Sequence, residues 1–393
     1  MRITLVIFSL VAGGAERVMA AMANFWAEKG WTVNLLTLDS GAEPPFYPLH
    51  PAVRHQSLAL AGISPGPVQA LLSNFRRVGK LRAAIRRTEP NAVISLMSET
   101  NVLTLLATAG LDMPVLVQEQ NEPSQQEICR TWGTLRRWTY PLATRVILLT
   151  ERSLGYFSPR VQKRVRIIPN PAMVTAGPGV PVAANGHGRT MIAMGRFVPQ
   201  KGLDLLLQAF ARIAEKHPDW SLEILGEGAL RGELEALTQS LGLRERVRLP
   251  GTTKEPHAKL RRADLFVMSS RHEGFPLSLC EALACGLPAI SFDCPTGPSE
   301  IIRDGIDGVL VPPENIVALS DAMDQLMGDA PRRAALAARA PEVLERFGNA
   351  LPYLVRCGSA MAGTGRDRSL DRKRRKHPFV NPRIDRLEIG ERQ

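Results

Sequence analysis

The sequence predicts an α/β protein made of two doubly wound, Rossmann-like domains that face each other across a cleft. Short β-branched runs alternate with helical segments along most of the 393 residues, and this alternation is typical of parallel sheets with helices on both faces. A stretch rich in Gly, Pro and Ala, residues 174–189, separates two such series and is predicted to be a linker. Ligands of these sheets bind at the carboxyl ends of the strands, so the cleft is the predicted site.

The first domain is predicted to span residues 1–173 and the second residues 190–347. In the first domain we expect strands at the run that begins at Met1, then at Val33–Leu38, Ala92–Met97, Val115–Glu119, Val146–Thr150 and Val165–Ile168, and helices at Val68–Arg87, Asn101–Ala109 and Glu122–Tyr140. In the second we expect strands at Met191–Met194, Ser221–Leu225, Val247–Leu249, Leu265–Met268, Ala289–Phe292 and Val309–Val311. The two halves therefore repeat one plan.

Composition narrows the class of protein. Five cysteines are scattered without a Cys-x-x-Cys pair, which favours reduced thiols in a cytosol over disulfides or zinc. The apolar run after Met1 is short and has no convincing cleavage site, so it is interpreted as a strand and not as a signal peptide; no run reaches the length of a spanning helix. We expect a cytoplasmic protein, with peripheral contact to the inner face of the plasma membrane as an open alternative.

The stretch Arg271–Pro288 carries the strongest chemical signal. It follows a buried strand, and a loop with Gly274 leads to Pro276, which suits the first position of a helix over Leu277–Cys285. Unpaired backbone N–H groups and the helix dipole at such a start attract phosphate. The N–H groups expected to point outward are those of Phe275, Leu277 and Ser278.

Two carboxylates, Glu273 and Glu281, frame this predicted phosphate site. Carboxylates suit the hydroxyls of a ribose and a sugar better than they suit a phosphate. A lone Glu-x7-Glu pair is more often two solvated glutamates on a surface helix, but the Gly-Phe-Pro insert and the Gly-Leu-Pro stop make the pattern far more specific. The stretch EGFPLSLCEALACGLPAI resembles the donor-site motif of the retaining glycosyltransferases of family 4, which have the GT-B fold. The resemblance covers roughly Met1–Phe347.

Further motifs agree with the resemblance. Arg196 and Lys201 follow the first strand of the second half. Two cations at this end of the sheet would neutralise a diphosphate and stabilise the negative charge that develops as the diphosphate leaves. In the family such a pair does that work, so the candidate catalytic residues are Glu273, Arg196 and Lys201. The other candidate donor-binding residues are Gly14, Gly195, Gly226, Gly228, Leu249, Gly274, Phe275, Pro276, Leu277, Ser278 and Glu281. The Gly226-Glu-Gly228 turn is about as well explained as a plain strand–helix turn.

Acceptor contacts are expected from the first domain. The candidates are Gly13, Glu16, Gln118, Glu119 and Asn121. A plain turn at Gly13-Gly14 and a solvated polar loop at Gln118–Pro123 are the alternatives. Many relatives carry a histidine near Gln118–Pro123, where this chain has none, so no general base is named. The segment Thr296-Gly-Pro-Ser-Glu300 resembles the form found in transferases that extend polyprenyl-diphosphate-linked or capsular glycans.

The resemblance implies retaining transfer of a hexose or N-acetylhexosamine from a UDP-sugar to a lipid-linked or polysaccharide acceptor, forming an α-glycosidic bond. No Asp-x-Asp motif occurs, so no metal or other cofactor is expected. A nucleotide-sugar epimerase of the same fold, or an inactive relative that acts as a binding module, is the alternative. Aromatics interleaved with basic residues are missing, so nucleic acid is not an expected partner.

The net charge of the chain is +11, and basic residues are concentrated in two segments. The predicted helix Val68–Arg87 interleaves basic with apolar residues, which suits an anionic membrane surface, although an ordinary packed helix with a basic outer face explains it equally well. Residues 348–393 lose the helical period, become rich in Arg and are predicted to be disordered. A frame shift in the gene would also produce that change, and a native basic arm is the alternative.

Overall fold

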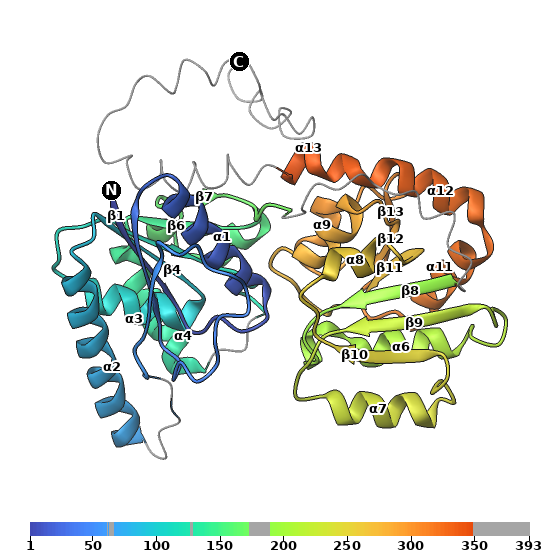
Figure 1. The fold of residues 1–393 in the computed structure, drawn as a ribbon, viewed down its shortest axis with the longest axis horizontal. Helices are drawn as coiled ribbons and strands as arrows, with labels where there is room; N and C mark the ends of the chain where they lie inside the picture. Colours follow the sequence, from blue (N-terminus) through green and yellow to red (C-terminus); the bar gives the residue numbers. More distant parts are fainter. Residues whose placement is uncertain (61, 63–66, 126–128, 173–188, 349–393) are drawn as a thin grey trace, which may run out of the picture.

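The structure is a computed structural model that describes residues 1–60, 62, 67–125, 129–172 and 189–348. Two α/β domains lie side by side, each a parallel sheet with helices on both faces (Figure 1). The first domain occupies the blue-to-green half of the chain and the second the yellow-to-red half. This architecture confirms the predicted fold class.

The first domain contains a seven-stranded parallel sheet in the order β3-β2-β1-β4-β5-β6-β7. Its elements are β1 (Arg2–Ile7), α1 (Gly14–Glu28), β2 (Thr32–Thr37), β3 (Arg54–Ser57), α2 (Pro67–Thr88), β4 (Ala92–Leu96), α3 (Ser98–Thr108), β5 (Val115–Gln118), α4 (Arg130–Thr139), η1 (Tyr140–Leu142), β6 (Arg145–Leu148), η2 (Arg152–Tyr156), α5 (Pro159–Gln162) and β7 (Val165–Ile167). Alternate residues of β1 pack into different cores, Leu5 with α1 and Val6 with α2 and α3, because successive strand side chains point to opposite faces. The sheet is therefore buried on both sides.

The second domain contains a six-stranded parallel sheet in the order β10-β9-β8-β11-β12-β13. Its elements are β8 (Arg189–Met194), η3 (Pro199–Lys201), α6 (Leu203–Ala211), β9 (Trp220–Leu225), α7 (Arg231–Ser240), β10 (Val247–Gly251), α8 (Pro256–Leu260), β11 (Leu265–Met268), α9 (Leu277–Ala284), β12 (Ala289–Phe292), α10 (Pro298–Ile301), β13 (Gly308–Val311) and α11 (Ile316–Gly328). One core cluster runs from the first domain through α9, so the two domains share apolar contacts where they meet.

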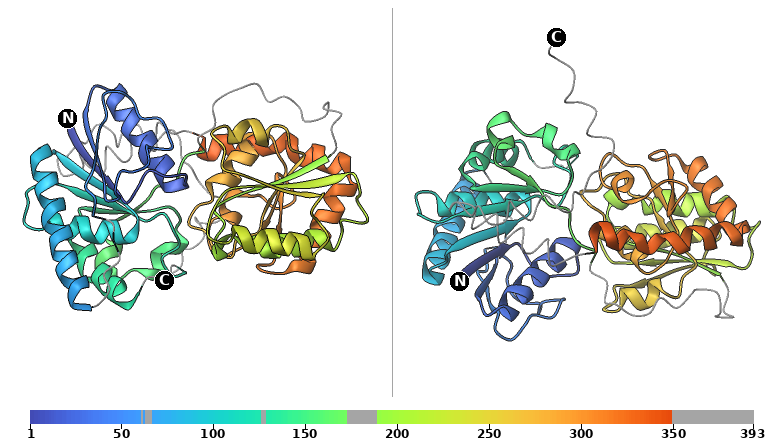
Figure 2. Two further views of the ribbon diagram at one scale, coloured as in Figure 1. Left: turned by 60° about the horizontal axis from the view of Figure 1, so that its bottom comes forward. Right: turned by 90° about the horizontal axis from the view of Figure 1, so that it is seen from above.

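A helical strap, residues 330–347, completes the second domain. It consists of α12 (Ala330–Arg339), η4 (Ala340–Glu342) and α13 (Val343–Phe347). The strap runs along the second domain and ends at its junction with the first (Figure 2). There the backbone N–H of Ala172 donates to the carbonyl of Phe347 at 2.9 Å. The strap therefore fastens the two domains together at one edge.

Every strand expected from the sequence is present, with ends shifted by one or two residues. Sequence reasoning missed β3, because Arg-His-Gln-Ser is polar and largely exposed at the sheet edge. The helix expected over Glu122–Tyr140 was too long: among the described residues it is α4, which begins at Arg130. Pro276 caps α9 instead of beginning it. The predicted linker and tail fall almost entirely on residues 173–188 and 349–393, outside the described residues.

No helix within the described ranges is both long enough and apolar enough to cross a membrane.

Candidate functional site

A cavity of about 1160 Å³ lies between the domains. Its walls include the segments that follow β1, β5 and β7 in the first domain and β8, β9, β10 and β11 in the second. Carboxyl ends of parallel strands meet at one edge of a sheet, and here two such edges face each other. The predicted cleft is therefore present.

Lys201 and Glu273 form an ion pair on the second-domain wall. The Nζ of Lys201 lies 2.5 Å from Oε1 of Glu273, and the hydroxyl of Ser270 donates to the same oxygen at 2.6 Å. Gly202 follows with φ +58°, and a Cβ there would collide with the carbonyl oxygen of Ser269. Glycine thus lets η3 fold back over the end of β11, which brings Lys201 from β8 and Glu273 from β11 together.

The donor loop, Glu273–Pro276, is wedged between other segments. Its carbonyl at Glu273 accepts a hydrogen bond from the buried Thr296 hydroxyl. A Cβ on Gly274 would collide with the backbone of Gln120 in the first domain, so only glycine permits the two domains to approach here. The loop leads into α9, whose first residues Leu277 and Ser278 line the cavity.

Arg17 of α1 reaches across the cavity and forms an ion pair with Glu281 of α9. Burial raises the pKa of the Glu281 carboxyl, and the Arg17 guanidinium opposes that rise. In this structure both glutamates of the Glu-x7-Glu motif are therefore paired with a cation, and one of the two pairs joins the domains.

His257 of α8 lies against the same pair. Its Nε2 is 3.2 Å from Nη2 of Arg17 and 3.8 Å from Oε2 of Glu281. Burial, with the positive charges of Arg17 and Arg261, lowers the pKa of His257 to about 4. The ring is therefore neutral near pH 7, and because a guanidinium only donates, Nε2 accepts from Arg17.

Gly13, Gly14 and Glu16 form one part of the first-domain wall. Burial raises the pKa of the Glu16 carboxyl, and its own backbone N–H and the charge of Arg196 act in the opposite direction. A Cβ on Gly14 would lie 3.4 Å from the Leu277 side chain. The start of α1 thus stands directly opposite the start of α9.

Two predicted acceptor residues lie behind the cavity wall. Glu119 is 2% exposed and accepts hydrogen bonds from Ser98 and Tyr140, with Arg136 3.7 Å away. Gln118 is also buried and donates to Asn170 at 3.3 Å. Gln118 is the last residue of the central strand β5 and Glu119 follows it directly. Because the sheet is covered on both faces at this point, both side chains stabilise the domain and do not line the cavity.

The cavity begins one residue later. Gln120, Asn121 and Asn170 line it, and Asn170 donates to Oε1 of Gln120 at 2.8 Å. Leu249, a predicted donor-binding residue, does not line the cavity either, because it lies within β10 and packs against the core of the second domain. Thr252 and Thr253, which follow that strand, line the cavity instead.

The other predicted residues do line the cavity, apart from Gly274, which forms the domain contact described above. They are Gly13, Gly14, Glu16, Asn121, Gly195, Arg196, Lys201, Gly226, Gly228, Glu273, Phe275, Pro276, Leu277, Ser278 and Glu281. Sequence reasoning missed Arg17 and His257. Arg17 had a usable signal, because it lies three residues after Gly14 in the first turn of a helix that points at the cleft; His257 had none.

No group of three His, Cys, Asp or Glu side chains that could hold a metal ion occurs among the residues that the structure describes.

The structure is a two-domain α/β architecture with one large cavity between the carboxyl ends of two parallel sheets. Residues 13–171 match the family model "Glycosyl transferase 4-like domain" and residues 181–343 match "Glycosyl transferases group 1". The chain belongs to the family 4 glycosyltransferases with the GT-B fold, and it is an enzyme of the transferase class.

Curated relatives agree with this family. An exopolysaccharide phosphotransferase of Streptomyces coelicolor is 33% identical over 68% of this chain, but the match spans only 28% of that protein. An α-1,4-N-acetyl-D-galactosaminyltransferase of Campylobacter jejuni, which by its name acts on an undecaprenyl-diphosphate-linked glycan, is 27% identical over 84% of this chain and 89% of its own length.

Solved structures show the same fold. Sucrose-phosphate synthase of Thermosynechococcus elongatus superposes with a TM-score of 0.77 at 20% identity, covering 92% of this chain and 98% of that one. HepE of Anabaena, solved with UDP and glucose, gives a TM-score of 0.73 at 18% identity over 92% and 99% of the two chains.

Proposed function

We propose that the protein transfers a hexose or N-acetylhexosamine from a UDP-sugar to a polyprenyl-diphosphate-linked or polysaccharide acceptor, with retention of the α configuration. The observation that carries the proposal is the pairing of Lys201 with Glu273 and of Arg17 with Glu281 around one cavity. A site with cations beside carboxylates fits a ligand that carries both phosphate and hydroxyls. The Campylobacter relative supports the class of acceptor, and HepE with UDP supports the nucleotide.

In this proposal the carboxylates of the site bind hydroxyl groups of the donor and the cations bind its diphosphate. Glu281 would accept hydrogen bonds from the ribose hydroxyls and Glu273 from the sugar, while Arg196, Lys201 and the start of α9 face the diphosphate. As the bond from the anomeric carbon to the β-phosphate oxygen breaks, negative charge grows on that oxygen and the sugar becomes oxocarbenium-like. The cations stabilise the departing charge. The acceptor hydroxyl attacks from the same face and gives its proton to a leaving phosphate oxygen.

Donor binding tests the proposal directly. A ligand that binds only the folded protein raises its melting temperature, so we expect UDP-sugars to raise Tm and nucleosides alone to have a smaller effect.

With an acceptor present, UDP should be released, and the release should be unaffected by EDTA. A thermal shift with another nucleotide alone would change the donor, and abolition by EDTA with rescue by Mn²⁺ would refute the metal-free mechanism. Release of UDP and free sugar without any acceptor would favour a hydrolase, and conversion of the UDP-sugar to its epimer with no release of UDP would favour the epimerase.

The acceptor proposed here would place the enzyme at a membrane surface on the cytoplasmic side. On the described part of α2, Leu81 and Ile85 pack into the core, which supports the plain packed-helix interpretation of the apolar face. Its outer face still exposes Arg76, Lys80, Arg86 and Arg87, with Phe75 70% exposed beside them. Each basic residue near an anionic surface contributes about 1 kcal/mol. The face is therefore suited to weak, salt-sensitive docking.

We expect the protein to bind phosphatidylserine-rich vesicles at low salt and to release them at high salt, since a Debye length shrinks with ionic strength. Replacing Arg76, Lys80 and Arg87 with Gln should weaken binding in a co-sedimentation assay, whereas Gln at the exposed Arg212, Lys216 and Arg244 of the second domain should not. Removing residues 349–393 separates the tail from the helix. Failure to bind anionic vesicles at low salt would favour a soluble acceptor.

A further inference from the structure

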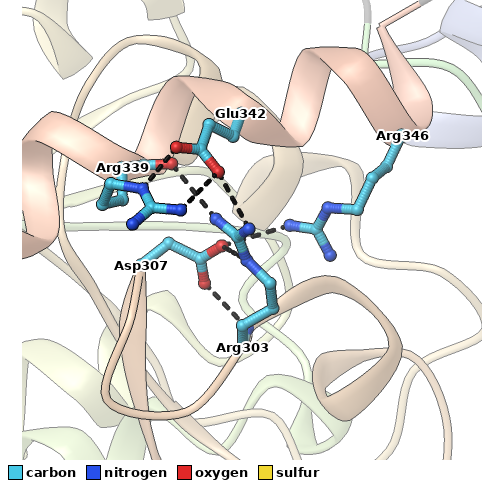
Figure 3. Close-up of polar contacts among 5 residues, drawn as sticks. All are labelled: Arg303, Asp307, Arg339, Glu342 and Arg346. Atoms are coloured by element: carbon cyan, nitrogen blue, oxygen red, sulfur yellow. Dashed lines mark hydrogen bonds and ion pairs between the residues drawn. The ribbon is translucent and has the colours of Figure 1, made fainter. Parts of the chain in front are cut away.

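A network of ion pairs around the buried Asp307, here called the Asp307 network, fastens the strap to the rest of the second domain (Figure 3). The Asp307 side chain is fully buried and accepts from the backbone N–H and Nε of Arg303, both at 2.7 Å, and from Nη2 of Arg346 at 3.2 Å. Arg303 also donates to Glu342 of the strap at 2.8 Å, and Arg339 pairs with the same carboxylate. A buried carboxylate is costly unless it is paired and hydrogen-bonded, so the network holds the strap in one position.

The next residue after Arg346 meets the donor loop. The ring of Phe347 lies 5.2 Å from the ring of Phe275 at an interplanar angle of 70°, an edge-to-face pair. The guanidinium of Arg346, which belongs to the network, lies over the Phe347 ring, 5.4 Å from its centroid. The strap therefore ends in a side chain that touches the loop containing Glu273.

Phe347 also touches the first domain through its backbone, because its carbonyl accepts from Ala172. Phe275 is 5% exposed and lines the cavity, and the donor loop is held at Glu273 by the Thr296 hydroxyl. The loop is thus fixed at one end by Thr296 and supported at Phe275 by Phe347.

We propose that Phe347 is a positioning residue: anchored by the Asp307 network, it holds Phe275 so that Glu273 and the start of α9 keep the geometry needed in the transition state. The inference rests on the proposed function and assigns the strap a part in it. A misplacement of about 1 Å in a catalytic group can lower a rate by about 10²-fold.

A double-mutant cycle tests the coupling. We expect Phe347→Leu to lower kcat about tenfold while KM for the donor changes less than about threefold, since the lost interaction acts on the transition state. Phe275→Leu should do the same, and the double variant should be no worse than the poorer single variant. Leu336→Ala is the matched control, because Leu336 is a buried strap residue that packs in the other core; it should lower stability and leave kcat unchanged. Effects that add in the double variant would overturn the proposal.

A second readout requires no transfer activity. In amide hydrogen exchange of the full chain without ligand, Phe347→Leu should speed exchange across residues 274–278 at least about threefold, and Leu336→Ala should not. Unchanged exchange in that segment would refute the positioning role even if the enzyme proves active. Faster exchange in a protein that transfers no sugar would refute the proposed function and leave the mechanical coupling intact.

Discussion

Replacing Lys201 with Ala is expected to lower kcat/KM by ~10²-fold or more, the scale of lost transition-state electrostatics. Lys201 is the cation held closest to the motif glutamate Glu273, at 2.5 Å, and it lies on the cavity wall with Arg196. The loss should fall mainly on kcat, because the negative charge of the leaving diphosphate grows as the glycosidic bond breaks. Arg196→Ala should act in the same direction.

Lys216 provides the control for this variant. It forms an ion pair with Asp324 at 2.6 Å, but its side chain is 66% exposed and lies outside the cavity. Lys216→Ala should therefore keep wild-type turnover, since exposed pairs contribute little. Near wild-type turnover in Lys201→Ala would contradict its assignment to the diphosphate.

Replacing Arg17 with Met is expected to reduce the free energy of unfolding by roughly 3 kcal/mol, the low end for a buried ion pair that loses one partner. The Glu281 side chain is only 2% exposed and would be left without that cation. Adding Glu281→Gln should recover most of the loss, because no charge then remains buried. Denaturant midpoints measure both changes.

The sign of the pH dependence follows from the raised pKa of Glu281. When the pKa of a carboxyl is higher in the folded than in the unfolded state, the folded state binds the proton more tightly. Such a carboxyl destabilises the fold at high pH, where it is ionised in both states, and no longer does so at low pH, where it is protonated in both states. The deficit of Arg17→Met should therefore be greatest near pH 8 and shrink as the pH falls toward 5. Arg2→Met, which disrupts the exposed pair with Glu89, should cost little at either pH; equal losses in the two variants would refute a special role for the Arg17–Glu281 pair.

The sequence predicted the parallel sheets well because buried strands such as Leu265–Met268 are short apolar runs with one possible environment. Glu273 and Lys201 were also predictable, since each follows a strand in a glycine-flanked loop. The polar edge strand Arg54–Ser57 had no apolar pattern to reveal it.

Contacts between the domains were beyond the reach of local patterns. Arg17 and Glu281 are far apart in the chain and meet only because two sheet edges face each other. Glu119 is a polar residue at a strand end, as a cleft residue would be, but it follows β5 directly and is buried among Ser98, Tyr140 and Arg136. The residue directly after β5 is still buried, and the cavity lining begins with Gln120, so a shift of one residue decides whether a polar side chain lines the cleft.

The stereochemistry of the product tests the central claim most directly. The enzyme would be incubated with the UDP-sugar that gives the largest thermal shift and with a polyprenyl-diphosphate-linked acceptor, and the new linkage examined by NMR at early times. The account predicts an α-linked product from an α-linked donor, with release of one UDP per bond. A β-linked product would contradict the arrangement of Lys201, Arg196 and Glu273 proposed here.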